Sequence, residues 1–248
     1  MRLKDKVAIV TGAAAGFGEG IARRFAQEGA KVVVADLNAR GVAELATEIG
    51  NDAIAVTTDV SQRADIDHMV SAAMSSFGRI DIVVNNAGFT HRKGDLLEVD
   101  ESTFDLVTAV NMKAIYYSTQ AVVPIMRKQG NGTILNTAST AGMRPQPGLT
   151  WYNASKGWII TATKSMAAEL AGEHIRVNCL CPMAGDTATL ERFMGANTPE
   201  LREKLRASVP LGRLSTPMDI ANAALWLVSD EAAFVTGVAL EVDGGGSI

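Results

Sequence analysis

The sequence predicts a single doubly wound α/β domain, in which a parallel sheet of seven strands is covered by helices on both faces. Short, almost uninterrupted apolar segments alternate along the chain with amphipathic helical segments, and such strands must be buried on both faces. The chain has 248 residues, of which 47% are hydrophobic, so it is long enough to form one sizeable core. No internal repeat, low-complexity tract or linker divides it. Residues 1–248 are therefore expected to form one domain.

Seven segments have the composition of buried strands, because they are short and rich in β-branched or other apolar residues. In chain order they are Val7–Val10, Val32–Ala35, Ala53–Val56, Ile80–Val84, Thr133–Asn136, Ile175–Leu180 and Val238–Val242. Six other segments have the apolar spacing of amphipathic helices. These are Gly18–Glu28, Arg40–Ile49, Ser61–Phe77, Glu101–Lys128, Tyr152–Ala171 and Pro217–Ser229. The polar stretch Met183–Arg213 breaks this alternation and is expected to be an irregular lid or binding loop.

Composition and charge exclude several classes of protein. The 23 basic and 27 acidic residues give a net charge of −4, and no Lys/Arg-rich run could follow a nucleic-acid backbone. No apolar stretch approaches the roughly 20 residues that span a bilayer, and the N-terminus lacks the pattern of a signal peptide. We therefore expect a soluble, cytoplasmic protein that binds neither nucleic acid nor membranes.

Cysteine and histidine usage predicts no metal site. Cys179 and Cys181 lie two residues apart in one predicted strand, where they face the same side but are too close along the chain for an ordinary disulfide. Unpaired cysteine behaves as a small hydrophobic residue, which favours core packing for both. The three histidines are scattered and do not have the spacing of metal ligands.

A glycine-rich turn follows the first predicted strand and opens the first helix. It has the sequence Thr11-Gly12-Ala13-Ala14-Ala15-Gly16-Phe17-Gly18. Glycine allows a tight turn and a close approach of the backbone to a ligand, and the free N–H groups at a helix start attract a pyrophosphate. A lone glycine pattern also occurs in ordinary turns. The order of strand, glycine turn and helix favours a dinucleotide site that uses Gly12, Gly16, Phe17 and Gly18.

Polar residues at the ends of the next strands support the same interpretation, because open α/β sheets bind ligands at the carboxyl ends of their strands. Asp36 ends the second strand, where its carboxylate can accept hydrogen bonds from the adenosine ribose and repel a 2′-phosphate. This favours NAD over NADP, although a solvated residue at a strand end is the alternative for Asp36. Asp59 and Val60 follow the third strand and are placed to reach adenine. The segment Asn85-Asn86-Ala87-Gly88 follows the fourth strand, but asparagine and glycine also form ordinary turns.

Tyr152 and Lys156 lie four residues apart in a predicted helix, so both side chains project from one face. A phenol has a pKa near ~10 and exchanges protons poorly at neutral pH, but a nearby ammonium group stabilises the phenolate and lowers that pKa. The pair is therefore suited to general acid–base catalysis. The same spacing occurs on many ordinary helix surfaces, so the pair alone does not establish a function.

Five motifs occur together in the order and spacing of one enzyme family. They are the glycine turn from Thr11 to Gly18, Asn85-Asn86-Ala87-Gly88, Asn111, Ser139 and Tyr152-Asn153-Ala154-Ser155-Lys156. Over essentially its whole length the sequence resembles the short-chain dehydrogenase/reductase family, in its single-domain form of ~250 residues. The resemblance implies a Rossmann-like fold, a homotetramer, and an NAD-dependent oxidoreductase that interconverts a secondary alcohol and a ketone.

The resemblance also implies roles for individual residues. Tyr152 is expected to be the general acid/base that exchanges a proton with the substrate oxygen as hydride moves to or from the nicotinamide. Ser139 would hold that oxygen by a hydrogen bond. Lys156 would lower the pKa of Tyr152 and bind the nicotinamide ribose, and Asn111 would anchor a water that leads protons from Lys156 to solvent.

The sequence departs from the family pattern at three places. Met183 replaces the glycine that usually follows Pro182, which changes the pocket wall, whereas Thr187 still matches the family threonine that contacts the cofactor carboxamide. Phe17 stands where isoleucine or leucine is usual and is expected to affect helix packing more than binding. Ala15 occupies a place where NADP-preferring members often carry a basic residue, which again favours NAD.

Three segments, which follow the fourth strand, Ser139 and Pro182, are expected to meet beside Tyr152 and bind the substrate. The candidate contacts are His91, Arg92, Arg144, Gln146 and Met183. An arginine fork suits a carboxylate or phosphate, and a glutamine suits hydroxyl groups, so a small sugar, polyol or hydroxy acid is favoured over a long acyl chain. In the alternative interpretation, both arginines are solvated or lie at a subunit contact.

Other functions remain as alternatives. The substrate of the same reaction could be a 3-oxoacyl thioester. A catalytically silent NAD(H)-binding regulator could use the same fold, since a fold does not determine a function. The complete set of Asn111, Ser139, Tyr152 and Lys156 argues against a silent regulator. Related epimerases and dehydratases usually have larger C-terminal substrate domains, whereas this chain ends soon after its last predicted strand.

Overall fold

The computed structural model describes residues 1–183, 185, 190 and 198–248. Among these residues, seven strands form one parallel sheet in the order β3-β2-β1-β4-β5-β6-β7. The strands are β1 (Val7–Thr11), β2 (Lys31–Asp36), β3 (Ala53–Thr57), β4 (Ile82–Asn85), β5 (Gly132–Thr137), β6 (Ile175–Pro182) and β7 (Ala239–Val242). Each strand lies where the sequence predicts one, so the predicted parallel sheet is confirmed.

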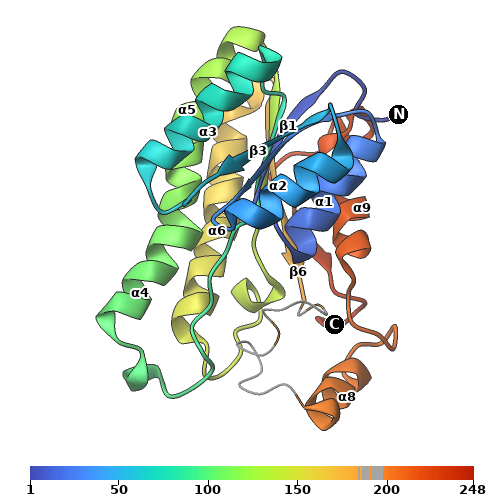
Figure 1. The fold of residues 1–248 in the computed structure, drawn as a ribbon. Helices are drawn as coiled ribbons and strands as arrows, with labels where there is room; N and C mark the ends of the chain where they lie inside the picture. Colours follow the sequence, from blue (N-terminus) through green and yellow to red (C-terminus); the bar gives the residue numbers. More distant parts are fainter. Residues whose placement is uncertain (184, 186–189, 191–197) are drawn as a thin grey trace.

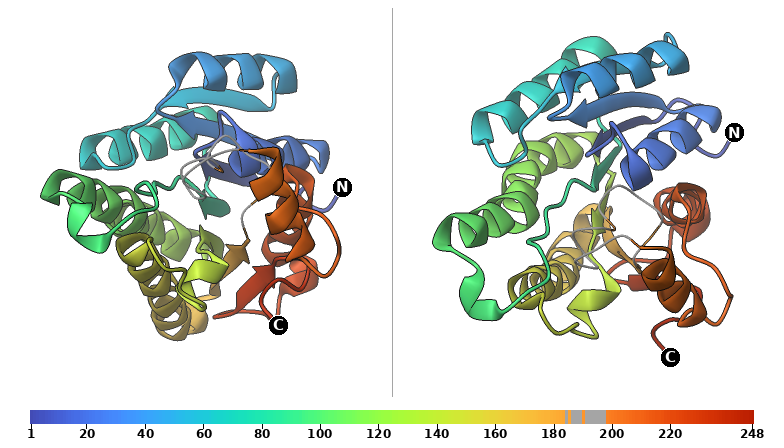
Figure 2. Two further views of the ribbon diagram at one scale, coloured as in Figure 1. Left: turned by 90° about the horizontal axis from the view of Figure 1, so that it is seen from below. Right: turned by 60° about the horizontal axis from the view of Figure 1, so that its bottom comes forward.

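The order of the strands reverses beside β1. From β1 the chain builds outward through β2 to β3, and it then returns so that β4 pairs with the other side of β1. Ile9 therefore lies between Val33 and Val83 in the sheet. Ligands of open α/β sheets bind at the carboxyl ends of the strands next to such a reversal. Figure 2 includes a view from below, toward this edge of the sheet, and shows the helices arranged around it.

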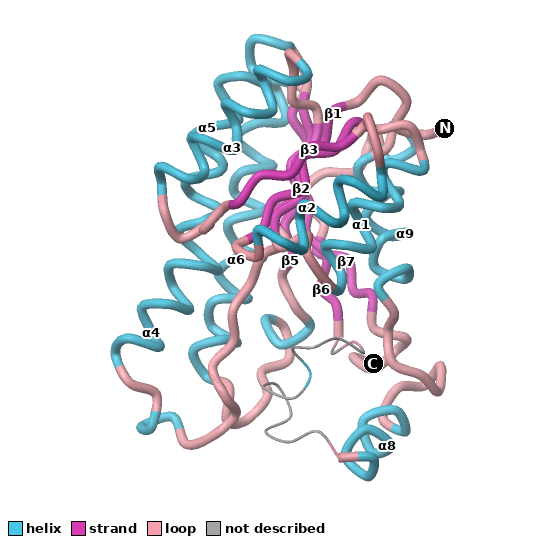
Figure 3. The backbone as a smooth tube through the Cα atoms, viewed as in Figure 1, coloured by secondary structure: helices cyan, strands magenta, loops and turns pink. Residues whose placement is uncertain are grey.

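Helices cover both faces of the sheet (Figures 1 and 3). One face is covered by α1 (Gly16–Gln27), α2 (Ala39–Ile49) and α9 (Pro217–Val228), and the other by α3 (Arg63–Phe77), α5 (Ala114–Gln129) and α6 (Thr150–Leu170). Neighbouring residues of β1 point to opposite faces: Val10 is in the core that contains Phe25 of α1, and Ile9 is in the core that contains Met69 of α3. Short 3₁₀ turns occur at Leu96–Glu98, Thr140–Gly142, Ala171–Glu173 and Asp230–Ala232.

The segment predicted as one long helix, Glu101–Lys128, is interrupted in the structure. It consists of α4 (Glu101–Thr108), a π-helical turn (Ala109–Lys113) and α5. Asn111 lies inside the π-helical turn. Such turns are rare and are frequently found at functional sites. The apolar spacing of a helix continues across this turn. The sequence therefore predicts a helix there but does not reveal that it changes from α-helical to π-helical geometry.

The prediction of an irregular structure over Met183–Arg213 is wrong in part, because a helix, α8 (Pro199–Ala207), lies within it. Thr198 caps this helix by accepting a hydrogen bond from the N–H of Leu201, and proline is tolerated at the first helical position. No residue of α8 is buried, so the segment lacks the apolar stripe that would have indicated a helix. Residues 184, 186–189 and 191–197 lie outside the described part of the chain.

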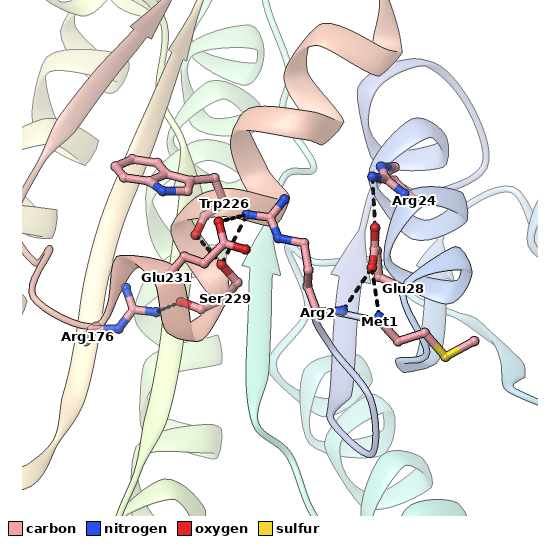
Figure 4. Close-up of polar contacts among 8 residues, drawn as sticks. All are labelled: Met1, Arg2, Arg24, Glu28, Arg176, Trp226, Ser229 and Glu231. Carbon is pink, nitrogen blue, oxygen red and sulfur yellow. Dashed lines mark hydrogen bonds and ion pairs between the residues drawn. The ribbon is translucent and has the colours of Figure 1, made fainter.

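The N-terminal residues connect α1 to the end of α9 at the amino edge of the sheet (Figure 4). The Arg2 guanidinium donates hydrogen bonds to the carboxylate of Glu231 (2.6 Å) and to the hydroxyl of Ser229 (3.4 Å). The backbone N–H of Arg2 donates to Glu28 (2.8 Å), which also forms an ion pair with Arg24 of α1. Exposed ion pairs contribute little individually. Together, these contacts hold two helices that share one core, on the side opposite the expected ligand site.

Cys179 and Cys181 are buried and form no disulfide, which confirms that they are core residues. They pack in a small cluster with Ile159 and Ile160 of α6. Among the residues that the structure describes, no helix has the length and apolar character needed to cross a membrane.

Candidate active site

A pocket of about 310 Å³ lies at the carboxyl ends of the strands, beside the reversal of strand order. Its walls come from the glycine turn, the end of β2, the segment after β4, the end of β5, α6 and the end of β6. The predicted residues that line it are Gly12, Gly16, Phe17, Asp36, Asn86, Ala87, Gly88, Ser139, Tyr152, Lys156, Pro182 and Met183. The fold therefore brings most of the predicted cofactor residues and three of the four predicted catalytic residues to one place.

The glycine turn has the tight backbone that the sequence predicts. Gly12 and Gly16 have φ angles of 64° and 62°, which L side chains rarely adopt. A Cβ atom on Gly12 would lie 2.8 Å from the Cα of Ala87, and one on Gly18 would collide with the carbonyl oxygen of Gly12. The helix α1 begins at Gly16 without a side-chain cap from its N-cap residue, Ala15. The turn can therefore approach a phosphate closely and offer it uncapped N–H groups.

Two polar side chains of the pocket hold the glycine turn in place. The carboxylate of Asp36 accepts a hydrogen bond from the backbone N–H of Ala14 (3.1 Å). The side-chain amide of Asn86 donates to the carbonyl oxygens of Thr11 (2.9 Å) and Gly12 (3.3 Å). Asp36 and Asn86 therefore position the turn as well as lining the pocket.

Four residues predicted to contact the cofactor do not line the described pocket or lie outside the described residues. Gly18 is buried in α1 beside the glycine turn. Asp59 accepts hydrogen bonds from the backbone N–H (2.9 Å) and the hydroxyl (2.7 Å) of Ser61, so its carboxylate forms the turn before α3. Val60 is buried in the core that contains α3. Neither residue lines the pocket, and their contact with adenine remains a prediction. Thr187 lies outside the described residues.

The hydroxyl groups of Ser139 and Tyr152 are hydrogen-bonded to each other at the pocket wall. Ser139 follows β5, and its oxygen accepts a hydrogen bond from the N–H of Ala141 (3.1 Å). The Ser139 hydroxyl also donates to the carbonyl oxygen of Pro182 (3.4 Å). Tyr152 projects from the first turn of α6. Two hydroxyls from separate elements are thus placed where they can bind the same oxygen atom of a ligand.

Lys156 lies one helical turn after Tyr152 and is buried. Its ammonium group donates a hydrogen bond to the carbonyl oxygen of Thr137 (2.7 Å) and lies 5.7 Å from the centre of the Tyr152 ring. Burial lowers the pKa of Lys156 to about 8. Burial raises the pKa of Tyr152 to about 12, although its hydrogen bond with Ser139 opposes the rise. The sequence led us to expect that Lys156 lowers the pKa of Tyr152. In the structure the pKa of Tyr152 is raised instead, because desolvation of the phenolate has the largest effect.

Asn111 connects the segment after β4 to α6 through its buried side chain. Its side-chain oxygen accepts a hydrogen bond from the N–H of Phe89 (2.8 Å). Its amide donates to the carbonyl oxygen of Phe89 (2.9 Å) and to the hydroxyl of Ser155 (2.9 Å). Ser155 in turn donates to the carbonyl oxygen of Tyr152 (2.7 Å). Sequence reasoning assigned no role to Ser155, although a polar residue between Tyr152 and Lys156 in a predicted helix was the available signal.

Known proteins resemble this chain over almost its full length. A family model described as enoyl-(acyl carrier protein) reductase matches residues 12–247. The chain is 49% identical to 4-formylbenzenesulfonate dehydrogenase TsaC1/TsaC2 of Comamonas testosteroni, with 100% of each chain covered. It is 40% identical to the 3-oxoacyl-[acyl-carrier-protein] reductase of Thermotoga maritima, with 99% of each covered. The crystal structure of 3-ketoacyl-(acyl-carrier-protein) reductase from Brucella melitensis complexed with NADH has a TM-score of 0.95 and 47% identity, covering 99% of this chain and 100% of that one.

The chain belongs to the short-chain dehydrogenase/reductase family. It is an oxidoreductase that acts on alcohol and carbonyl groups. The resemblance found in the sequence motifs and the reaction class that it implies are both confirmed. Within the described residues, no group of three histidine, cysteine or acidic side chains is arranged to hold a metal ion.

In this dehydrogenase/reductase, only one of the five predicted substrate residues, Met183, lines the described pocket. His91 is 4% exposed, with Nδ1 2.9 Å from the carbonyl oxygen of Arg92. Its buried Nε2 has no hydrogen-bond partner among the described residues. Arg92, Arg144 and Gln146 are exposed. Substrate contact by these four residues remains a prediction. Among the other lining residues, Ala15 belongs to the glycine turn, and Phe89, Thr90, Gly185 and Leu190 belong to segments expected at the pocket. Sequence reasoning missed Thr137 and Ala138 at the end of β5.

The buried Lys156 is expected to make the free energy of unfolding rise with pH. Its pKa falls from 10.5, the ordinary value, to about 8 in the folded chain, so the unfolded chain binds more protons between these two values. Relative to a Lys156→Met variant, the wild-type free energy of unfolding should increase by about 2 kcal/mol between about pH 7.5 and about pH 9.5. Denaturant titrations at the two pH values measure this difference.

The matched control for this experiment is Lys128→Met, which removes an exposed ammonium group and should follow the wild type. Tyr152 acts in the opposite direction, because its pKa is raised from 10.0 to about 12, but only above the measured range. Parallel stability curves for the wild type and Lys156→Met would show that Lys156 is not desolvated.

Proposed function

We propose that this short-chain dehydrogenase/reductase interconverts a compact, polar secondary alcohol and its ketone, with Tyr152 as the general acid/base. The observation that carries the proposal is the hydrogen-bonded pair of hydroxyls from Ser139 and Tyr152, which shares one pocket with the glycine turn and Asp36. A silent NAD(H)-binding regulator would need only the glycine turn and Asp36.

The pocket fits NAD at both ends. The glycine turn forms a cradle that side chains would fill, and we assign the pyrophosphate to Gly12, Gly16 and the backbone of Phe17. Asp36 is placed to accept hydrogen bonds from the adenosine ribose. Lys156 is assigned to the nicotinamide ribose. When bound, NAD supplies the acceptor or donor of the hydride.

Tyr152 carries the proton at neutral pH, because its pKa is about 12. In ketone reduction, its hydroxyl donates this proton to the substrate oxygen, which Ser139 holds by a hydrogen bond. In alcohol oxidation the phenolate must accept the proton, so the rate of oxidation should rise with pH. Lys156 stabilises the phenolate while its own ammonium is charged. Asn111 is assigned to a water that leads protons from Lys156 to solvent.

The proposed substrate is compact because the Met183 side chain lines the pocket that Ser139 and Tyr152 also line. The relative at 49% identity is named for 4-formylbenzenesulfonate, a single aromatic ring with a carbonyl and an anionic group. This name supports a small substrate with an anionic group, such as a hydroxy acid, although the carbonyl of 4-formylbenzenesulfonate is an aldehyde and not a ketone. The second candidate is a 3-oxoacyl thioester, which is favoured by the names of the Thermotoga and Brucella relatives.

A kinetic screen with both NAD and NADH distinguishes these substrates. The panel contains polyols and sugars, small hydroxy acids, 4-formylbenzenesulfonate with its alcohol, and 3-oxoacyl thioesters. We expect kcat/KM for the best compact substrate to exceed that for the thioesters by about tenfold or more, since even one methylene group changes specificity by that order. The reverse ranking would select the thioester reductase. Tight NADH binding without turnover of any panel member would favour the silent regulator.

We further propose a cytoplasmic homotetramer, with the stretch 183–213 acting as a substrate lid. Exposed aromatic side chains support subunit contacts at two places: Phe104 and Trp158 on α4 and α6, and Trp226 with Phe234 at α9 and the segment after it. Clusters of exposed apolar residues are typical of interaction sites. Light scattering of the purified protein measures the subunit number, and a monomeric mass would contradict the proposal.

A further inference from the structure

Met183 lies just after β6 and lines the same pocket as the hydroxyl pair. It follows Pro182, whose carbonyl oxygen accepts the hydrogen bond from Ser139. It also lines the pocket together with Ser139 and Tyr152. A methionine side chain is long and flexible and readily fills irregular space. Met183 therefore contributes bulk to the wall of the pocket that contains the hydroxyl pair.

The C-terminal turn packs against the Met183 side chain. β7 pairs with β6 so that Val242 lies opposite Pro182. Gly244 and Gly245 follow with φ angles of 63° and 86°, and the carbonyl oxygen of Gly244 accepts a hydrogen bond from the N–H of Leu211 (3.1 Å). This left-handed turn directs the chain back toward the end of β6.

Gly246 is the residue of this turn that meets Met183. A Cβ atom on Gly246 would lie 2.5 Å from Sδ of Met183 and 3.3 Å from its Cε. Carbon and sulfur atoms cannot approach so closely, so the thioether occupies space that only a glycine leaves open. Any side chain at position 246 would displace the end of the Met183 side chain.

We propose that Met183 sets the upper size limit of the substrate and that Gly246 is the positioning residue that holds its thioether away from the reacting oxygen. This inference rests on the proposed function, because it names the residue that limits the size of the substrate at that same site. Met183 restricts the length of the group attached to the carbonyl carbon. Gly246 leaves room behind the methionine, so that the pocket remains open to a compact substrate.

The test compares four variants on a homologous series of straight-chain 3-oxo esters, from short to long. Met183→Gly should raise kcat/KM for the long esters relative to the short ones by about tenfold or more, whereas Met183→Leu, which keeps the bulk, should retain the wild-type preference. Gly246→Ala should lower kcat/KM for the short esters by about tenfold, because the displaced thioether enters the pocket. The double variant with Met183→Gly and Gly246→Ala should recover this loss, since no thioether remains to be displaced.

Gly172→Ala is the matched control for Gly246→Ala, because a Cβ atom there would have no neighbour within 4 Å. Its kinetics should equal those of the wild type. Titration of nicotinamide fluorescence with NADH and thermal melting confirm that every variant is folded. The inference is overturned if the wild type is active but Met183→Gly has the same chain-length preference. It is also overturned if the loss of kcat/KM in Gly246→Ala persists in the double variant. A wild type that reduces no carbonyl compound would instead remove the proposed function, and the size limit with it.

Discussion

Replacing Tyr152 by phenylalanine is expected to lower kcat by about 10²- to 10⁴-fold while NADH affinity stays close to that of the wild type. The substitution removes the hydroxyl that exchanges the proton and loses its hydrogen bond with Ser139, but it keeps the ring in the first turn of α6. Steady-state kinetics on a verified substrate and an NADH fluorescence titration measure the two effects separately.

The pH profile gives this prediction a second, independent readout. Oxidation by the wild type should accelerate as pH rises, because the pKa of Tyr152 is about 12 and the reaction needs the deprotonated phenol. Tyr152→Phe should lack this rise in its residual activity. The matched control is Tyr116→Phe, which removes the same hydroxyl from an exposed position on α5. Wild-type kcat in Tyr152→Phe would exclude Tyr152 as the acid/base.

The second large effect expected is a preference for NAD over NADP of about a hundredfold or more in kcat/KM. A carboxylate that faces a 2′-phosphate experiences like-charge repulsion and loses its hydrogen bonds to the ribose, a penalty of several kcal/mol. Asp36 lines the pocket at the end of β2, and Ala15 beside it supplies no positive charge for the phosphate. Initial rates with the two cofactors at matched substrate concentration measure the preference.

Asp36→Asn is the sharper variant for this test, because it removes the charge but keeps one oxygen. That oxygen can still accept one of the two backbone hydrogen bonds, which come from the N–H groups of Ala14 and Asn38. The preference should shrink by about tenfold or more without loss of the folded turn. Asp52→Asn, which neutralises an exposed carboxylate away from the pocket, should leave the ratio unchanged. Equal use of NAD and NADP by the wild type would contradict the role assigned to Asp36.

Local patterns in the sequence predict those strands and helices whose burial follows one regular pattern from end to end. The strand Val7–Thr11 is buried at every position, so its composition alone indicates a strand covered on both faces. The helix α8 has no buried residue, so the same reasoning could not find it. In the π-helical turn, the side chain of Asn111 forms hydrogen bonds with Phe89 and Ser155, which are distant in the sequence, so no local pattern predicts them.

The roles of individual residues also differ in whether the sequence or only the fold predicts them. Asp36 ends the second strand and Asp59 follows the third, so the sequence predicts a cofactor contact for both residues. In the structure Asp36 lines the pocket, whereas Asp59 binds the backbone and hydroxyl of Ser61. The direction of the Tyr152 pKa shift also depends on the fold, because burial outweighs the opposing hydrogen bond with Ser139.

The sequence by itself determined the parallel sheet, the glycine turn and the family, and it predicted Tyr152 and Lys156 as the catalytic pair, because each is indicated by short patterns in the chain. Only the tertiary structure decided which side chains share the pocket and how they are solvated. It placed Arg144 at the exposed surface and put Met183 against Gly246, more than sixty residues away. Desolvation and packing between distant segments are properties of the folded chain, and no local pattern encodes them.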